Sequence, residues 1–194
     1  GGRWSTAFTA RLTPTNSEQI TIPSITGGSI TDQTGNLHLL VAPNSLTDDE
    51  TIQLTQLSPQ GLIRQLPLGW SPIFSVEIAP AEVSFSQPAT LKMPIPIDIP
   101  DRAGIYTASW DTVNSKWVAV SSPTRSADGG YWELSLNSGG QYAVLIPDAA
   151  PDTPPLPGTG QAIEGVPAPS ITTSYAITLS PAPRILFTAA NVRS

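Results

Sequence analysis

Few residues in this chain have the chemistry that catalysis needs. Cysteine is absent, and His38 is the only histidine among 194 residues. A Ser-His-Asp triad would depend on His38, because the nucleophilic serine needs an imidazole base. That histidine stands inside the alternating run Leu37 to Val41, and the chain contains no G-x-S-x-G turn. A histidine-based metal site is equally short of ligands. We therefore predict that the protein is not an enzyme and carries no cofactor.

Carboxylates offer two candidate pairs for acid–base chemistry. Glu77 would act with Glu133, or Asp98 with Asp101. Glycoside hydrolysis needs two carboxyl groups held at a defined separation across one bond. Nothing in the spacing of these residues selects either pair, so no catalytic residue is predicted.

Calcium is the metal that these acidic residues would suit best. Asp48, Asp49 and Glu50 lie in one expected turn, and Asp98 with Asp101 in another. Both groups supply oxygen ligands, but neither resembles the D-x-D-x-D loop of a calcium site. We expect Asp48 and Asp49 to cap the turn before the next strand, and we predict no metal site.

Three tryptophans form a candidate ligand platform. Trp110 and Trp117 flank the turn DTVNSK, and Trp132 begins the following apolar strand. If all three were exposed on adjacent strands, the indoles would stack against sugar rings. If buried, they would supply core packing, because large aromatic side chains dominate the burial of apolar area. The sequence leaves both interpretations open.

Charge argues against nucleic acid as a partner. The net charge is −6, and only nine residues are Lys or Arg. Phosphate binding needs clustered cations, whereas these are scattered along the chain. No apolar run has the roughly 20 residues that a membrane helix takes, so we expect no membrane insertion. Charged residues make up only 12% of the chain, and Ser and Thr together number 42. That balance favours an extracellular or cell-surface protein.

Strands dominate the expected secondary structure. The chain holds 21 prolines and 15 glycines, which leave few windows long enough for a helix. Alternation with period two recurs instead. Phe74, Val76 and Ile78 share one face of an expected strand, and Trp132, Leu134 and Leu136 share one face of another. Strands spaced by about ten residues with turn signals between them predict an all-β fold, an antiparallel β-sandwich.

We expect four segments along the chain. Residues 1–26 form an N-terminal strand extension with runs at Trp4 to Leu12 and Ile20 to Ile22, residues 27–148 form the sandwich, and residues 149–169 form a Pro/Gly-rich extended spacer. Residues 170–194 resume a β-pattern as a strand pair. Because an isolated hairpin is marginal in water, this pair must dock on its own or a neighbouring sandwich.

Strand and turn residues between Gly35 and Pro94 carry a resemblance to a known family. The stretch Leu37 to Leu46 with its corner at Pro43, Ser71-Pro72 leading to Ile78 and Ala79-Pro80, and Phe85 followed by Gln87-Pro88 resemble the ZU-type domain of ankyrins, netrin receptors and tight-junction scaffolds. The resemblance implies a β-sandwich of the ZU or immunoglobulin-like kind that binds partners without catalysis. Some relatives cleave their own backbone at a His-Phe-Ser sequence, whereas this chain has Gly139 to Leu145 at that place. The missing nucleophile implies no self-cleavage.

The terminal segments are the candidate assembly elements. Each could add a strand to the sheet edge of another copy, which requires no special side chain. The predicted function is a non-catalytic structural subunit of a cell-surface filament or layer, a homo-oligomer or one of several neighbouring modules. The alternative is an adhesion or carbohydrate-binding module that uses the tryptophan platform. The candidate assembly residues are Trp4, Phe8, Leu12, Tyr175, Ile177, Leu179, Ile185 and Phe187.

Overall fold

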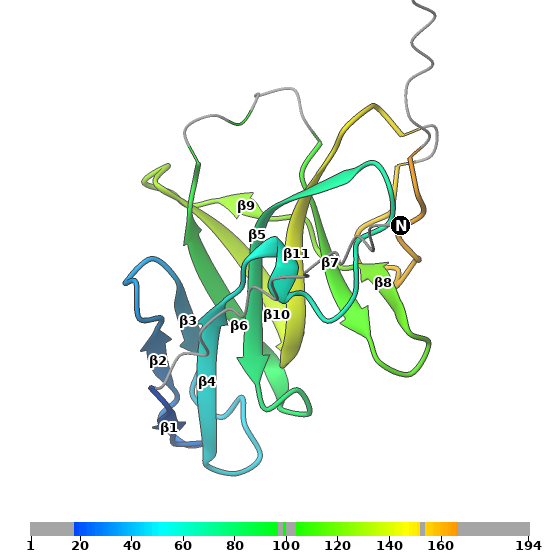
Figure 1. Cartoon of the computed structure of the whole chain (residues 1–194). Helices are drawn as coiled ribbons and strands as arrows, with labels where there is room; N and C mark the ends of the chain where they lie inside the picture. Colours follow the sequence, from blue (N-terminus) through cyan, green and yellow to red (C-terminus); the bar gives the residue numbers. More distant parts are fainter. Residues whose placement is uncertain (1–17, 97–98, 100–103, 152–153, 167–194) are drawn as a thin grey trace, which may run out of the picture.

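Two antiparallel β-sheets pack face to face in the computed structural model, which describes residues 18–96, 99, 104–151 and 154–166 (Figure 1). No α-helix occurs among these residues, and a single 3-10 turn spans Pro59–Gly61. The predicted all-β sandwich is confirmed. The described part of the chain also holds no helix of the length and apolarity needed to cross a bilayer.

The first sheet has six strands in the order β1-β4-β5-β11-β7-β8. Its strands are β1 (Ile20–Ile22), β4 (Glu50–Gln56), β5 (Trp70–Ala79), β11 (Gly140–Pro147), β7 (Tyr106–Asp111) and β8 (Lys116–Ala119). The run Ile20 to Ile22 is a strand, as predicted, and it pairs with β4, so it belongs to the sandwich itself.

The second sheet has five strands in the order β2-β3-β6-β10-β9. Its strands are β2 (Gly28–Thr31), β3 (His38–Val41), β6 (Ser84–Pro94), β10 (Tyr131–Ser138) and β9 (Thr124–Arg125). Two pairs of consecutive strands are divided between the sheets. In the pair β5 and β6, and again in the pair β10 and β11, one strand belongs to each sheet.

Gly139 makes the crossover from β10 to β11 possible. Its amide donates to the carbonyl oxygen of Val83 at 2.8 Å, so it lies against the other crossover, between β5 and β6. A Cβ atom at Gly139 would overlap the carbonyl oxygen of Pro80 and approach Val83 Cγ1 to 2.8 Å. Only glycine fits where the two crossovers meet.

The main core lies between the two sheets. On β10 the buried face holds Trp132, Leu134 and Leu136, and on β5 it holds Val76 and Ile78 with the partly buried Phe74 packed beside them. Both predicted faces are therefore correct. Burying one such side chain contributes about 1.5–3 kcal/mol, so these alternating positions favour the sandwich over an open sheet.

A second apolar layer covers the outer face of the six-stranded sheet. Its buried members are Trp70, Ala108, Trp117, Ala119, Ala143, Leu145, Ile163 and Val166. Two of these residues come from the stretch that we expected to be a spacer. Residues 154–166, called the strap below, lie along β8: Ala119 N donates to Gln161 O at 2.7 Å, and Ile163 N donates to Trp117 O at 2.9 Å. The spacer interpretation did not include this docking.

Candidate functional site

His38 takes part in a surface contact on β3. Its Nδ1 lies 3.1 Å from the hydroxyl of Thr31, and its ring meets Tyr131 edge-on with 6.3 Å between centroids. These contacts fix the orientation of the imidazole on the outer face of the five-stranded sheet.

The carboxylate pair Glu77 and Glu133 is divided between the two sheets. Glu77 Oε1 accepts from Gln141 Nε2 at 3.1 Å on the six-stranded sheet. Glu133 on β10 forms an ion pair with Lys92 on β6 at 2.9 Å, and the hydrogen bond and charge of Glu133 raise the pKa of Lys92. With the core between them, these two carboxylates cannot act on one bond.

The acidic turn near Asp48 is held by protein groups. One oxygen of Asp49 accepts from the amide of Ser24 at 2.8 Å and from its hydroxyl at 3.1 Å. Asp49 thus holds the turn at Ser24, 25 positions away in the sequence, and not its own turn as expected for Asp48 and Asp49. The described residues contain no group of three or more acidic or histidine side chains that could hold a metal ion. Asp98 and Asp101 lie outside the described residues.

The structure separates the three predicted platform tryptophans. Trp132 lies in the core between the sheets, on a strand of the five-stranded sheet. Trp110 and Trp117 are neighbours on β7 and β8, with ring centroids 5.5 Å apart and an interplanar angle of 66°. Trp117 is buried, and Trp110 is partly buried. The geometry therefore leaves Trp110 as the one member of the set with surface that a ligand could contact.

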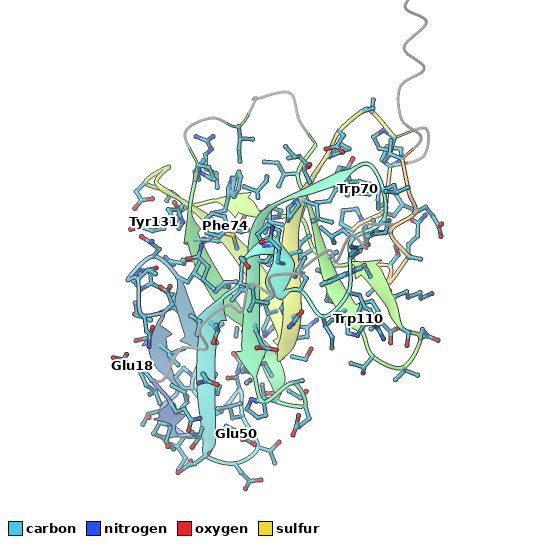
Figure 2. The ribbon with its side chains drawn as sticks, in the orientation of Figure 1. Glu18, Glu50, Trp70, Phe74, Trp110 and Tyr131 are labelled. Carbon is cyan, nitrogen blue, oxygen red and sulfur yellow. The ribbon has the colours of Figure 1, made fainter. Side chains whose placement is uncertain are left out.

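Trp110 lines an open groove of about 800 Å³ that the sequence did not predict. One wall is the loop that carries residues 62–68, and the other is the β7–β8 hairpin with Ser115 and Lys116; Trp117 and Ile163 also line it. Figure 2 shows Trp110 on this hairpin. Ile63 and Leu68 in the loop are exposed, at 53% and 85%. The groove thus combines apolar surface with an aromatic ring.

The loop wall is fixed at both ends. Ile63 N donates to Gln141 Oε1 at 2.8 Å, which ties the start of the loop to β11. Val166 N donates to Leu68 O at 2.8 Å, and the strap also accepts a bond from Trp70 Nε1 through the carbonyl of Glu164 at 2.7 Å. The strap and the sheet therefore both hold the loop in place at its ends.

Trp117, one of the lining residues, has a buried polar atom without a hydrogen-bond partner among the described residues. The indole Nε1 of Trp117 is buried and has no hydrogen-bond partner among the described residues. Leaving a buried donor without an acceptor costs about 1–3 kcal/mol. The packing of Trp117 therefore lowers the stability of the folded state at this position.

The candidate assembly residues in 1–17 and 167–194 lie outside the described residues, so Trp4, Phe8, Leu12, Tyr175, Ile177, Leu179, Ile185 and Phe187 are not placed. Comparison with protein-family models and with curated proteins finds no match.

Proposed function

We propose that this protein is a non-catalytic structural module of an extracellular or cell-surface assembly, and that copies associate by β-strand addition. The terminal segments supply the added strands. The acceptor is the pair of edge strands β1 and β2, called the β1–β2 edge below, which lie next to each other at one side of the sandwich (Figure 1). The resemblance to ZU-type domains fits a partner-binding role and stays part of this proposal.

Among the described residues nothing covers or blunts the β1–β2 edge, and this observation carries the proposal. Natural sheets usually blunt their edges with charged residues, proline or a covering segment, because an open edge pairs with other chains. The strap covers β8 through a bridge between Val118 and Ala162, and β9 is two residues long with an arginine. By contrast, β1 reads ITI and β2 reads GSIT, with no charge and no proline.

Charge distribution supports the same pairing. Residues 18–166 contain all fifteen Asp and Glu but only five Lys and Arg, so their net charge is −10. The flanking segments contain Arg3, Arg11, Arg184 and Arg193 and no acidic residue, so together they carry +4. Opposite charges speed the encounter of two surfaces and favour the correct partner. A basic terminal segment is therefore attracted to the acidic sandwich of another copy.

Edge charge gives a direct test. Ser29 on β2 and Thr90 on β6 both point to the outer face of the five-stranded sheet, in register on either side of Leu40. Lysine at Ser29 would place a charge at the free edge and repel arginine-bearing segments, whereas lysine at Thr90 would lie on an interior strand.

Light scattering and electron microscopy of the full chain would measure the outcome. We expect polymers of the native chain, at least about tenfold weaker assembly for Ser29→Lys and little change for Thr90→Lys, together with weaker assembly at high salt. A native chain that stays monomeric at every concentration, or equal assembly of both variants, contradicts the proposal.

A further inference from the structure

We propose that the groove between the 62–68 loop and the β7–β8 hairpin binds an acidic sugar chain, through its cations and Trp110. This goes beyond strand addition and does not depend on it. In the six-stranded sheet β1 and β8 are the opposite end strands, so the groove and the β1–β2 edge occupy different sides of the sandwich (Figure 1).

Charge in the groove has the sign opposite to that of the protein. Its lining includes Arg64 and Lys116 and no Asp or Glu, although the chain has a net charge of −6. Both cations are exposed. Two cations on facing walls of a groove that has no carboxylate in its lining are complementary to a ligand that carries carboxylates along its length.

Lys116 has one acidic neighbour, Asp111, directly across the hairpin. That carboxylate is already used: it accepts from the side chain of Asn114 at 2.7 Å and from the amides of Val113 and Asn114 at 3.0 Å each. Hydrogen bonds from Asn114, and to a lesser degree the charge of Lys116, lower the pKa of Asp111. Asp111 thus holds the turn, and among the described residues no hydrogen bond joins its carboxylate to the ammonium of Lys116.

The aromatic ring of Trp110 supplies the contact surface for the sugar rings of the proposed ligand. Trp110 is held edge-to-face by the buried Trp117, so its ring orientation is set by packing before any ligand arrives. Aromatic side chains contribute large apolar contact area at little loss of conformational freedom. Exposed Ile63 and Leu68 extend the apolar wall.

Other anionic polymers fit the groove less well. A peptide that added as a strand would need a free sheet edge here, but β8 is already bonded to the strap. A nucleic acid would need more than two cations on a protein of this net charge. A chain of acidic sugars would contact both features: its sugar rings would stack on Trp110, and its carboxylates would pair with Arg64 and Lys116.

Isothermal titration of the full chain with short oligomers of galacturonate, glucuronate and mannuronate tests the proposal, with their methyl esters as neutral controls. We expect saturable binding of at least one acidic oligomer and its loss on esterification. Binding should weaken at least about tenfold in Trp110→Ala and in the double variant Arg64→Gln/Lys116→Gln. The double variant Lys92→Gln/Arg125→Gln removes the same charge from the other sheet and should bind normally.

Two controls keep the test decisive. The double variant Arg64→Gln/Lys116→Gln changes exposed side chains only, so its result stands even if Trp110→Ala unfolds. Poly-glutamate could bind as tightly as the sugars and be equally sensitive to the variants. That result would overturn the assignment of a sugar ligand and indicate an acidic protein as the partner. No binding of any acidic oligomer up to about 10 mM would overturn the proposal and leave the groove to a second copy or a segment of this chain.

Discussion

Replacement of Asp32 by alanine should unfold the turn that shapes the β1–β2 edge. Asp32 follows β2, and its carboxylate is buried at 5% exposure. One oxygen accepts from the amides of Leu37 at 2.8 Å and Asn36 at 2.9 Å, and the other accepts from the hydroxyl of Thr34 at 2.6 Å. The side chain thus sets the connection between β2 and β3.

The magnitude follows from what alanine would leave behind. Leu37 is fully buried, so its amide would lose its acceptor with no water to replace it, a loss of about 1–3 kcal/mol. Asn36 and Thr34 lie at the surface and can bond water, and they add about 1 kcal/mol together. We expect Asp32→Ala to lower the free energy of unfolding by roughly 2–4 kcal/mol, out of a typical total of 5–15 kcal/mol.

Asp32→Asn is the matched control. It removes the same charge but keeps one oxygen for Leu37 and Asn36. Its amide group can donate to the hydroxyl of Thr34, and it loses only the long 3.3 Å bond from the exposed amide of Thr34, which can bond water instead. We expect Asp32→Asn to lower the free energy of unfolding by less than about 1 kcal/mol. Urea unfolding followed by tryptophan fluorescence measures both variants. If the two variants lose equal stability, or if alanine costs less than about 1 kcal/mol, the reasoning from the buried amide is refuted.

Two further predictions concern the crossover between the sheets. Gly139→Ala should lower the free energy of unfolding by about 3 kcal/mol or more, because the new Cβ meets backbone atoms that no side-chain rotation can move away. The control Gly129→Ala, at φ +74° with open space around it, should lower it by about 1–2 kcal/mol. Equal shifts of the thermal unfolding temperature in the two variants would contradict this prediction. Burial raises the pKa of Tyr142, whose hydroxyl donates to Ser138 O at 2.8 Å. Its contribution to stability is therefore complete below about pH 10 and is lost as the pH rises through the folded value. Tyr142→Phe should cost about 1 kcal/mol at pH 7 and flatten the alkaline loss in urea unfolding from pH 7 to 11; an unchanged pH profile would exclude this cause.

Alternation along single strands predicts the faces of this fold well. Val76 and Ile78 on β5 and Leu134 on β10 all point to the core, as the period of two requires. Parity says nothing, however, about which sheet a strand joins. Trp132 follows the hairpin that carries Trp110 by only two turns, yet it belongs to the other sheet. The sheet change is set by long-range pairing, which no local pattern encodes.

The sequence of β11 contains a pattern that indicates a covering segment such as the strap. In β11 the four consecutive residues Tyr142, Ala143, Val144 and Leu145 are apolar, and all are buried. A continuous apolar run indicates a strand covered on both faces. Composition alone suggested a free spacer, because proline and glycine exclude regular structure. They do not prevent an irregular segment from lying on an apolar sheet.

The candidate site was only partly within reach of the sequence. Trp110 was among the predicted ligand residues, but its partners Arg64 and Lys116 are 52 positions apart and meet only through the fold. The division between basic terminal segments and an acidic centre was readable from the sequence. It needed charge to be counted by segment, because the total of −6 conceals it.

Hydrogen exchange of the backbone amides in β1 and β2 tests strand addition most directly. Amides that point away from β4 and β3 have no strand partner within the described part of the chain, and each would gain a hydrogen bond when another segment pairs there. Comparing dilute monomer with assembled protein, we expect exchange at these amides to slow by about tenfold or more, with little change in the interior strands β6 and β11. Unchanged exchange along Ile20–Ile22 and Gly28–Thr31 in the assembled protein would contradict the account.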